Sequence, residues 1–374
     1  MANPNIHYLT DIHFDVSVGR VLPGVLDQIG VKRPMAVTDP QIAGMGLIDR
    51  LNVDVAAVYD RVRSNPDESA CVEAVDHFRA HDCDGCVALG GGSSIDLAKA
   101  VSLLVHHKPP LGQYAFIRGG LEKIHDDILV PVVAVPTTAG SGSEVGRAAL
   151  ITLDDGEKLA LLSPKLIPTA AICDPDLTVS MPASLTAATG MDAMSHCIEN
   201  FCSRLDNAIA DAIAIDGLDR AWSSIRGAVA DGRNRTCRRE MMLCALAGGL
   251  TFQKGLGAVH SLSHPMGALG GGRLHHGTLN AVFMPHVLRF NMDSCPQKMD
   301  AVADRVGVAR RADLPDAFAR LAGDLGLPTR LADMGVSATD LEPLAPRALA
   351  DHCSACNPRQ LSVEDCASLY AAAL

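Results

Sequence analysis

The sequence predicts an α/β N-terminal domain with a parallel sheet, followed by an all-α C-terminal domain. In the first half of the chain, short apolar runs alternate with segments of helical period, which is typical of a parallel sheet with helices on both faces. Strand-like runs stop near residue 177, and from Pro182 onward alanine- and leucine-rich segments of helical period dominate. We therefore expect domains at 1–178 and 179–374.

Four apolar runs in the first half are the expected strands of that sheet. Each run is short and rich in small or β-branched residues, and polar or glycine-rich turns flank it. A helix is expected from Ile95 to about His106, after the third run and the turn 90–94. The expected strands are 33–39, 53–59, 86–89 and 130–136.

Composition limits the class of protein. With 374 residues, 48% of them hydrophobic, the chain can bury a core in each of two domains. A formal net charge of -11 argues against nucleic-acid or anionic-membrane partners, and favours a small-molecule substrate. Neither a signal peptide nor a transmembrane segment is recognisable, so we expect a cytoplasmic protein. The twelve cysteines, including the pairs Cys83/Cys86 and Cys353/Cys356, are expected to be reduced and mostly buried.

A glycine-rich turn predicts an anion site in the first domain. Gly90-Gly91-Gly92-Ser93-Ser94 lies between an expected strand and helix, so its backbone N–H groups and the helix dipole could face a pyrophosphate. A second small-residue loop, Thr137 to Ser143, leaves another strand at the same edge. Asp39 also ends a strand at this edge. A carboxylate there would accept hydrogen bonds from a ribose diol and favour NAD over NADP. The alternative is that Asp39 is a plain turn residue.

The second domain holds a candidate metal site. Asp192 and His196 are four residues apart in a helical segment, so one face presents a carboxylate and an imidazole to the same point. Further along the chain lie His260, His264 and the pair His275-His276. One Asp with two or three His suits iron or zinc better than calcium or magnesium, although a surface ion pair or a capped core histidine would show the same spacing.

Taken together, these segments resemble the iron-containing, or group III, alcohol dehydrogenase family over nearly the whole chain. The resemblance implies the fold of that family, which is dehydroquinate synthase-like, and a homodimer. It rests on Gly-Gly-Gly-Ser-x-x-Asp-x-x-Lys at 90–99, Pro-Thr-Thr-x-Gly-x-Gly-Ser-Glu at 136–144, the Asp192/His196 helix, and the block from His260 to Asn291.

The resemblance also implies roles for particular residues. His264, one turn after His260, matches a position that relays protons near the reacting carbon. The implied metal ligands are Asp192, His196, His260 and His276, with His276 preferred to His275 because it directly precedes a glycine. The implied NAD contacts are Asp39, Asn65, Gly92, Ser93, Thr137, Thr138, Ser141, Lys158 and Leu177, and the two loop motifs add Gly91, Ser94, Asp96 and Ser143.

The implied activity is hydride transfer between NAD and an alcohol, at a metal-bound alkoxide. Fe(II) is the expected metal and Zn(II) the alternative. Within the family, the segments 252–257, 260–265 and 275–281 resemble members that interconvert 4-hydroxybutyrate and succinate semialdehyde. Such a substrate needs a cation for its far carboxylate, which Lys254 or Arg147 could supply. Lys254 could equally be a structural lysine.

Three other functions stay open at this stage. A general short-chain alcohol or diol dehydrogenase of the same family would prefer uncharged substrates. A maleylacetate reductase shares the fold without depending on the metal cluster, and the intact ligand set argues against it. A non-catalytic metal- or nucleotide-binding protein would take up metal without turnover, but the complete set of ligands and both nucleotide loops make that reading the weakest.

Overall fold

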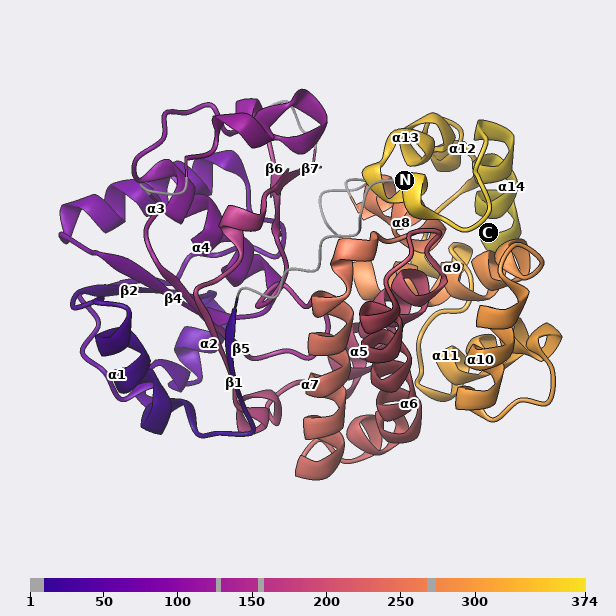
Figure 1. Ribbon diagram of the computed structural model, residues 1–374, viewed down its shortest axis with the longest axis horizontal. Helices are drawn as coiled ribbons and strands as arrows, with labels where there is room; N and C mark the ends of the chain where they lie inside the picture. Colours follow the sequence, from indigo (N-terminus) through magenta and orange to yellow (C-terminus); the bar gives the residue numbers. More distant parts are fainter. Residues whose placement is uncertain (1–9, 126–128, 154–157, 268–273) are drawn as a thin grey trace. The chain divides into compact units, whose positions relative to one another are not determined.

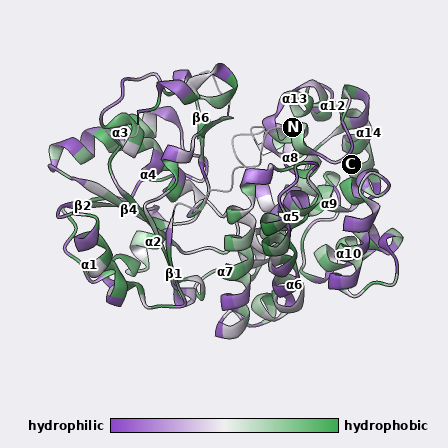
Figure 2. Cartoon of the chain, viewed as in Figure 1, coloured by the Kyte–Doolittle hydropathy of each residue, from purple (hydrophilic) through white to green (hydrophobic). Residues whose placement is uncertain are grey.

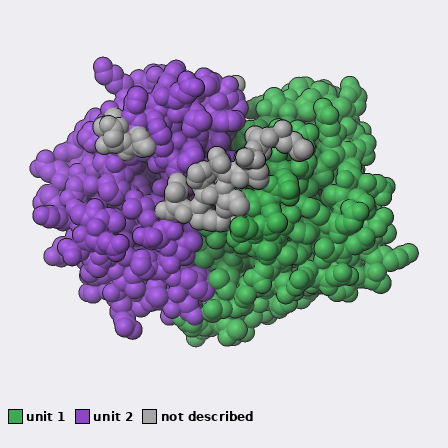
Figure 3. Space-filling model, viewed as in Figure 1, with its two compact units in different colours: residues 1–7, 139–141, 181–374 green, residues 8–138, 142–180 purple. Residues whose placement is uncertain are grey.

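The computed structural model describes residues 10–125, 129–153, 158–267 and 274–374. The chain forms two compact units, coloured separately in Figure 3. One contains the described residues of Tyr8–Thr138 together with Gly142–Ser180, and we call it the sheet unit. The other contains Ala139–Ser141 and Met181–Leu374, and we call it the helical unit. The change after Ser180 lies close to the expected boundary near residue 178, but the three residues Ala139–Ser141 belong to the helical unit.

The sheet unit is built on a parallel sheet that has six strands among the described residues, in the order β1-β8-β5-β4-β2-β3 (Figure 1). The expected α/β architecture is confirmed. A separate antiparallel hairpin pairs β6 with β7. The strands are β1 Asp11–Phe14, β2 Pro34–Val37, β3 Ala57–Tyr59, β4 Gly85–Gly90, β5 Val132–Pro136, β6 Ala148–Thr152, β7 Lys158–Leu162 and β8 Ala170–Cys173.

Helices cover both faces of this sheet. In β4, Cys86 and Ala88 pack into one hydrophobic cluster, together with residues of α3 and α4. The alternate residues Val87 and Leu89 pack into a second cluster, which contains residues of α1. Side chains of a strand point alternately to the two faces of the sheet, so a fully buried strand such as β4 needs apolar cover on both faces. The helices of the unit are α1 Val18–Gln28, α2 Pro40–Gly44, α3 Glu68–Ala80 and α4 Gly92–Leu104.

The order of the strands reverses between β2 and β4. From β2 the chain moves to β3 on one side, then returns to β4 on the other side of β2 and continues outward to β5. The carboxyl ends of adjacent strands at such a reversal are where open α/β sheets bind ligands. Asp39 follows β2, the Gly90–Ser94 turn follows β4, and Thr137 follows β5. The fold therefore gathers the expected nucleotide loops at one edge.

The helical unit surrounds α5, Ala183–Cys202, which is buried along almost its whole length. Helices α6, α7 and α9 all pack against it (Figure 1). Outer helices such as α10 carry hydrophilic and hydrophobic residues on the same ribbon (Figure 2), and α10 buries Met299 and Val302. The other helices are α6 Ala208–Ala230, α7 Arg235–Leu250, α8 Ala258–Gly267, α9 His276–Asn291, α10 Pro296–Val306, α11 Leu314–Asp324, α12 Ala338–Leu341, α13 Leu344–Ala350 and α14 Val363–Ala373.

Among the described residues, no single helix is long and apolar enough to cross a membrane. Among these residues, one pair of consecutive helical segments, Arg235–Lys254 and Ala258–Gly267, has the length and composition of a membrane span when taken together. The two segments are bent by 102° at the break between them. All twelve cysteines are free thiols, and most of them are buried, as expected.

Candidate metal centre and nucleotide edge

Helix α5 carries two of the expected metal ligands on one face. Asp192 and His196 are both buried, and His196 Nε2 lies 3.5 Å from Asp192 Oδ1. Gly248 of α7 makes room for His196, since a Cβ there would lie 2.7 Å from His196 Cβ. The close packing of α7 on α5 therefore fixes where this imidazole points.

Two further histidines reach the same carboxylate oxygen from α8 and α9. His260 Nε2 and His276 Nε2 each lie 3.6 Å from Asp192 Oδ1. Asp192, His196 and His260 form a compact group, with one donor atom from each within 4.8 Å of the others. Gly277 lets the start of α9 approach α5, because a Cβ at this position would lie 2.2 Å from the carbonyl oxygen of Ala188. The sequence pattern thus brings all four expected ligands to one point.

The spacing of these donors fits a bound divalent metal. The separations of 3.5 and 3.6 Å are too long for hydrogen bonds between the donors. Metal–nitrogen and metal–oxygen bonds of about 2.0–2.2 Å in a tetrahedral arrangement put neighbouring ligand atoms about 3.3–3.6 Å apart. One carboxylate and three imidazoles form a hard-to-borderline donor set without sulfur, which suits iron(II) or zinc(II). The four residues therefore match in chemistry, and the distances from Asp192 Oδ1 to the three histidines match in geometry.

The electrostatics of the cluster favour the metal-binding forms of Asp192 and His196 but not that of His260. Burial raises the pKa of Asp192, but the three facing histidines outweigh it and hold the pKa well below 3.8. Burial lowers the pKa of His196 to about 4, despite the facing Asp192. At neutral pH the carboxylate is thus charged and this imidazole is neutral, which are the forms that bind metals. Burial lowers the pKa of His260, but the facing Glu199 and Asp192 outweigh it and raise the pKa to about 9, so a metal at His260 displaces a proton.

Two polar side chains hold the ligands in place. Glu199, on α5 and almost fully buried, accepts from Val259 N (2.6 Å) through Oε1, and its Oε2 lies 2.5 Å from His260 Nδ1. Asn280, one turn after His276 on α9, donates from Nδ2 to Asp192 Oδ1 (2.7 Å). A carboxylate on the far nitrogen of a ligand histidine sets its tautomer and increases its basicity. Glu199 therefore orients His260. Asn280 Nδ2 also lies 3.2 Å from His260 Nε2 and from His276 Nε2, so this one amide contacts three of the four expected ligands.

His264 lies beside this cluster, one turn after His260 on α8. Its ring is 5.7 Å from the His260 ring and 5.4 Å from the His276 ring, centroid to centroid, and is stacked on the latter. Its Nδ1 lies 2.9 Å from Asp351 Oδ2. A histidine next to the metal ligands, with a carboxylate on one nitrogen, has the arrangement of a general acid and base.

At the edge of the sheet unit, the turn after β4 has the shape of an anion site. Gly90 has φ +156°, and a Cβ there would lie 2.3 Å from Ser94 Oγ, so the turn requires glycine. The 13-residue helix α4 begins at Gly92, with its first N–H groups beside Gly91. The side chain of Asp39 caps α2 through Oδ1, while its Oδ2 lies near Gly90. The three expected loops therefore meet here.

The loop before α3 joins the same edge. Ser93 Oγ donates to the carbonyl of Ser64 (2.7 Å), and Lys158 Nζ donates to Asn65 Oδ1 (2.8 Å). Thr138 lies against Gly91, at 3.3 Å from the position of a Cβ. The expected NAD contacts that are partly exposed are Asp39, Asn65, Gly91, Gly92, Ser93, Thr138, Ser141 and Lys158.

Three expected NAD contacts are buried in the structure. Asp96 is buried and accepts from Ser143 Oγ (2.6 Å) and Leu150 N (3.1 Å). Ser143 also accepts from Lys99 Nζ (2.8 Å), so the two residues belong to a buried network that joins α4 to β6. Leu177 is 1% exposed and belongs to the hydrophobic core. Their side chains make these contacts inside the unit, and their assignment to the cofactor stays a prediction. Ser94 and Thr137, expected at the same site, are buried as well.

Of the two alternatives for Lys254, the contacts in the structure favour a structural lysine over a ligand of the substrate carboxylate. Lys254 is 1% exposed, and its Nζ forms an ion pair with Asp211 and donates to the carbonyl of Phe201 (3.2 Å). Lys298 pairs with the other oxygen of Asp211 (2.9 Å). Lys254 therefore joins the end of α5 to α6. Arg147 is half-buried just before β6, and its role stays a prediction.

Sequence reasoning missed Glu199, Asn280 and Asp351. Glu199 follows His196 by three residues and Asn280 follows His276 by four, so helical spacing from the ligands could have found both. Asp351 lies 87 residues from His264 in sequence, and no local pattern connects them.

A parallel sheet with a phosphate-type turn at its reversal point, and a helical unit with a buried Asp–His cluster, define a nucleotide-linked, metal-dependent oxidoreductase. Two family models match the chain, iron-containing alcohol dehydrogenase at residues 10–175 and the C-terminal part of the Fe-containing alcohol dehydrogenase family at residues 186–374. The chain belongs to the iron-containing alcohol dehydrogenase family, and membership implies a nicotinamide dinucleotide, a divalent metal and alcohol or aldehyde substrates.

Individual relatives agree with this assignment. The chain is 47% identical to a 4-hydroxybutyrate dehydrogenase of Cupriavidus necator, over 96% of this chain and 97% of the relative. It is 36% identical to an NAD-dependent methanol dehydrogenase of Bacillus methanolicus, over 93% and 94% of the two chains. A crystal structure of a 1,3-propanediol oxidoreductase matches with a TM-score of 0.93 and 33% identity, over 99% of this chain and all of the other.

Proposed function

We propose that this enzyme interconverts 4-hydroxybutyrate and succinate semialdehyde, with NAD as the hydride carrier. The observation that carries the proposal is the 47% identity, over nearly the full length of both chains, to a protein named 4-hydroxybutyrate dehydrogenase. The segments 252–257, 260–265 and 275–281, which suggested this substrate from sequence, lie next to or within the metal cluster on η8 (Phe252–Lys254), α8 and α9.

Asp192, His196, His260 and His276 would hold the metal, with iron(II) as the first candidate. The metal, when bound, lowers the pKa of a coordinated alcohol and polarises the carbonyl of the aldehyde. Glu199 holds the His260 ring so that Nε2 faces Asp192, and Asn280 fixes the Asp192 carboxylate. His264 holds or releases a proton at the imidazole, with Nδ1 fixed by Asp351.

The sheet unit would bind NAD at its carboxyl edge. The N-terminus of α4 and the turn at Gly90 supply backbone N–H groups for the pyrophosphate. Asp39 keeps Oδ2 available for a ribose hydroxyl, because its helix cap uses Oδ1. A carboxylate at this position would repel the 2′-phosphate of NADP. NAD is therefore the proposed partner of the site.

The test compares kcat/KM for 4-hydroxybutyrate and 1-butanol, each with NAD and NADP, using protein loaded anaerobically with Fe(II). The proposal predicts a kcat/KM for 4-hydroxybutyrate at least tenfold above that for butanol, with NAD preferred. Equal values, or a higher value for butanol, would contradict the hydroxy-acid assignment.

A second candidate is a general dehydrogenase of short-chain alcohols and diols. It is favoured by the 36% identity to a methanol dehydrogenase, and by the contacts of Lys254, which favour a structural lysine over a carboxylate ligand. Arg147 is then the remaining candidate cation from the sequence. Arg147→Met separates the two functions, since it should raise KM for 4-hydroxybutyrate and leave KM for butanol unchanged only if the hydroxy acid is the substrate.

A further inference from the structure

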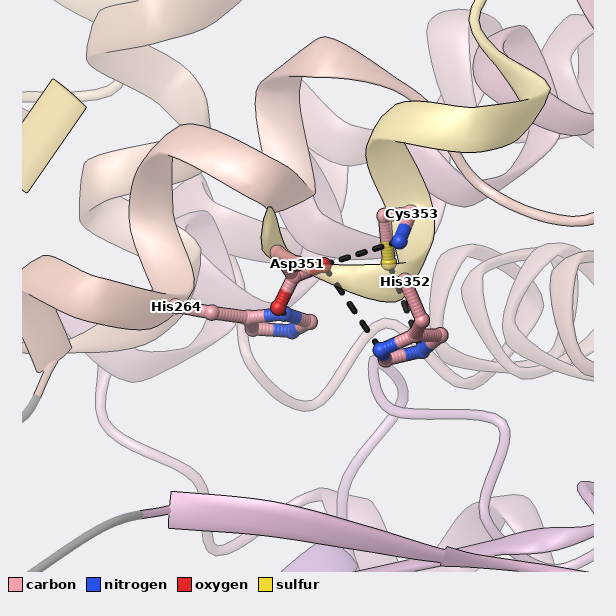
Figure 4. Close-up of side chains that lie close together, drawn as sticks. All are labelled: His264, Asp351, His352 and Cys353. Carbon is pink, nitrogen blue, oxygen red and sulfur yellow. Dashed lines mark hydrogen bonds and ion pairs between the residues drawn. The ribbon is translucent and has the colours of Figure 1, made fainter. Parts of the chain in front are cut away.

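A second group of side chains that could bind a metal includes His264 and none of the four expected ligands. It consists of His264 on α8 and of Asp351, His352 and Cys353 where the chain enters η12, His352–Cys356 (Figure 4). One donor atom from each of these residues lies within 4.8 Å of the other three. We call this group the His264 cluster.

The geometry of the His264 cluster is held by the backbone. Asp351 caps η12, and its Oδ1 accepts from Cys353 N (2.9 Å), which ties the carboxylate to the thiol-bearing residue. Asp351 Oδ2 contacts His264 Nδ1 at 2.9 Å, and Oδ1 lies 3.6 Å from His352 Nδ1. Cys353 Sγ lies 3.5 Å from His352 Nε2. The four side chains are therefore adjacent, and His352, which faces Asp351 with Nδ1 and Cys353 with Nε2, offers one of these two nitrogens to an ion.

The donors of this cluster differ in kind from those of the catalytic site. Two imidazoles, one carboxylate and one thiol form a zinc-type set, whereas the catalytic site contains no sulfur. Burial raises the pKa of the Cys353 thiol well above 9, so only an ion that binds sulfur strongly would displace its proton. The thiol among the donors therefore disfavours magnesium, and the usual order of affinities favours zinc over iron(II).

We propose that His264, Asp351, His352 and Cys353 form a second, zinc-selective site whose occupancy inhibits the enzyme. With Nδ1 on the Asp351 carboxylate, His264 accepts a proton at Nε2. An ion bound to Nδ1 replaces the Nδ1 proton and leaves the imidazole with its proton on Nε2, so that no lone pair remains there to accept another. The inhibitory part rests on the proposed role of His264 in proton transfer. The binding part does not, and it can be tested without substrate.

Cobalt(II) alone is the probe for binding, because thiolate coordination gives an intense near-ultraviolet charge-transfer band, whereas nitrogen and oxygen ligands give only weak visible bands. We expect the wild-type protein to bind two equivalents of Co(II), one of them with the charge-transfer band. Cys353→Ser and His352→Ala should each lose that band and keep the visible bands of the catalytic site.

Cys356→Ser is the matched control, since Cys356 lies three residues further on and outside the cluster. Its band should match that of the wild type. Saturation at one equivalent without the band, or a band that persists in Cys353→Ser, would overturn the proposal. His352→Ala keeps the test decisive if Cys353→Ser folds poorly, because His352 is partly exposed while Cys353 is fully buried.

Inhibition is measured by adding Zn(II) to enzyme loaded with Fe(II). We expect the rate of the wild type to fall at least tenfold at a Zn(II) concentration that leaves His352→Ala within twofold of its own rate without zinc. Equal loss in both proteins would mean that zinc acts at the catalytic site, and would overturn the inhibitory role. The cobalt experiment is independent of this result and of the identity of the substrate.

Discussion

Glu199→Gln removes a carboxylate from the far side of a metal ligand while keeping the shape of the side chain. Glu199 accepts two hydrogen bonds in a buried setting, from Val259 N and from His260 Nδ1. An amide has one acceptor oxygen, so whichever way it turns, one of these two donors faces an NH₂ group. The ring of His260 loses its charged partner in both orientations, and the remaining amide either faces His260 Nδ1 with its NH₂ group or loses its anchor on Val259 N.

The expected loss follows from these two contacts. Mutation of such a partner typically reduces metal affinity by about 10–100-fold. One buried donor left unsatisfied costs about 1–3 kcal/mol of folding stability. We therefore expect the Co(II) dissociation constant of Glu199→Gln to rise by about 10–100-fold, with a lower melting temperature that added metal only partly restores.

The assay is competition with a chelator of known affinity, followed through the weak visible bands of the catalytic cobalt. Glu240→Gln is the control, because Glu240 is a carboxylate on α7 that pairs with Arg220 and Arg239, and it is not in contact with a ligand histidine in the described contacts. A dissociation constant for Glu199→Gln within threefold of the wild type would refute the reasoning that Glu199 orients His260 for the metal.

Three further outcomes are expected. Lys254→Met should reduce stability by about 1–3 kcal/mol, because Asp211 Oδ1 loses its buried partner and only Lys298 remains on the carboxylate, and should leave KM for 4-hydroxybutyrate unchanged; a rise in KM without loss of stability would favour the substrate site for Lys254. Gly277→Ala should weaken metal binding and lower the melting temperature, since its Cβ would overlap the carbonyl of Ala188; metal content equal to the wild type would contradict this. Burial raises the pKa of Glu144 from 4.5 to about 7, so its protonated form stabilises the fold and this contribution is lost as pH rises from about 4.5 through 7. Glu144→Gln should therefore reduce the loss of stability across that range by up to about 3 kcal/mol, and an unchanged pH profile of unfolding by denaturant would count against it.

Much of the fold could be predicted because its strongest signals are local. The run 86–89 and the glycines after it predicted β4 and the start of α4, since a buried strand and a phosphate-type turn both leave a clear pattern. The edge strand β1, the strand β8 and the hairpin β6–β7 are not among the expected strands. β1 is only four residues long with exposed and half-buried positions, so it has no apolar run.

The site residues also differ in how local their sequence signal is. Asp192 and His196 share one helical turn, and the pattern therefore predicted their convergence. The contacts that were not predicted join side chains that are distant in sequence. Lys254 meets Asp211 across 43 residues, and Asp96 meets Ser143 across 47, so neither pairing leaves a local pattern. Asp39 is an intermediate case. The sequence predicted that it ends a strand, but not that one of its carboxylate oxygens caps α2 while the other does not.

The central claim is that Asp192, His196, His260 and His276 hold one divalent metal. Anomalous scattering from crystals grown with one equivalent of Co(II), recorded on both sides of the cobalt absorption edge, tests it most directly. The account predicts a single strong peak about 2.0–2.2 Å from Asp192 Oδ1 and from each of the three Nε2 atoms. A peak that lacks any of these four contacts, or no peak at this position, would contradict it.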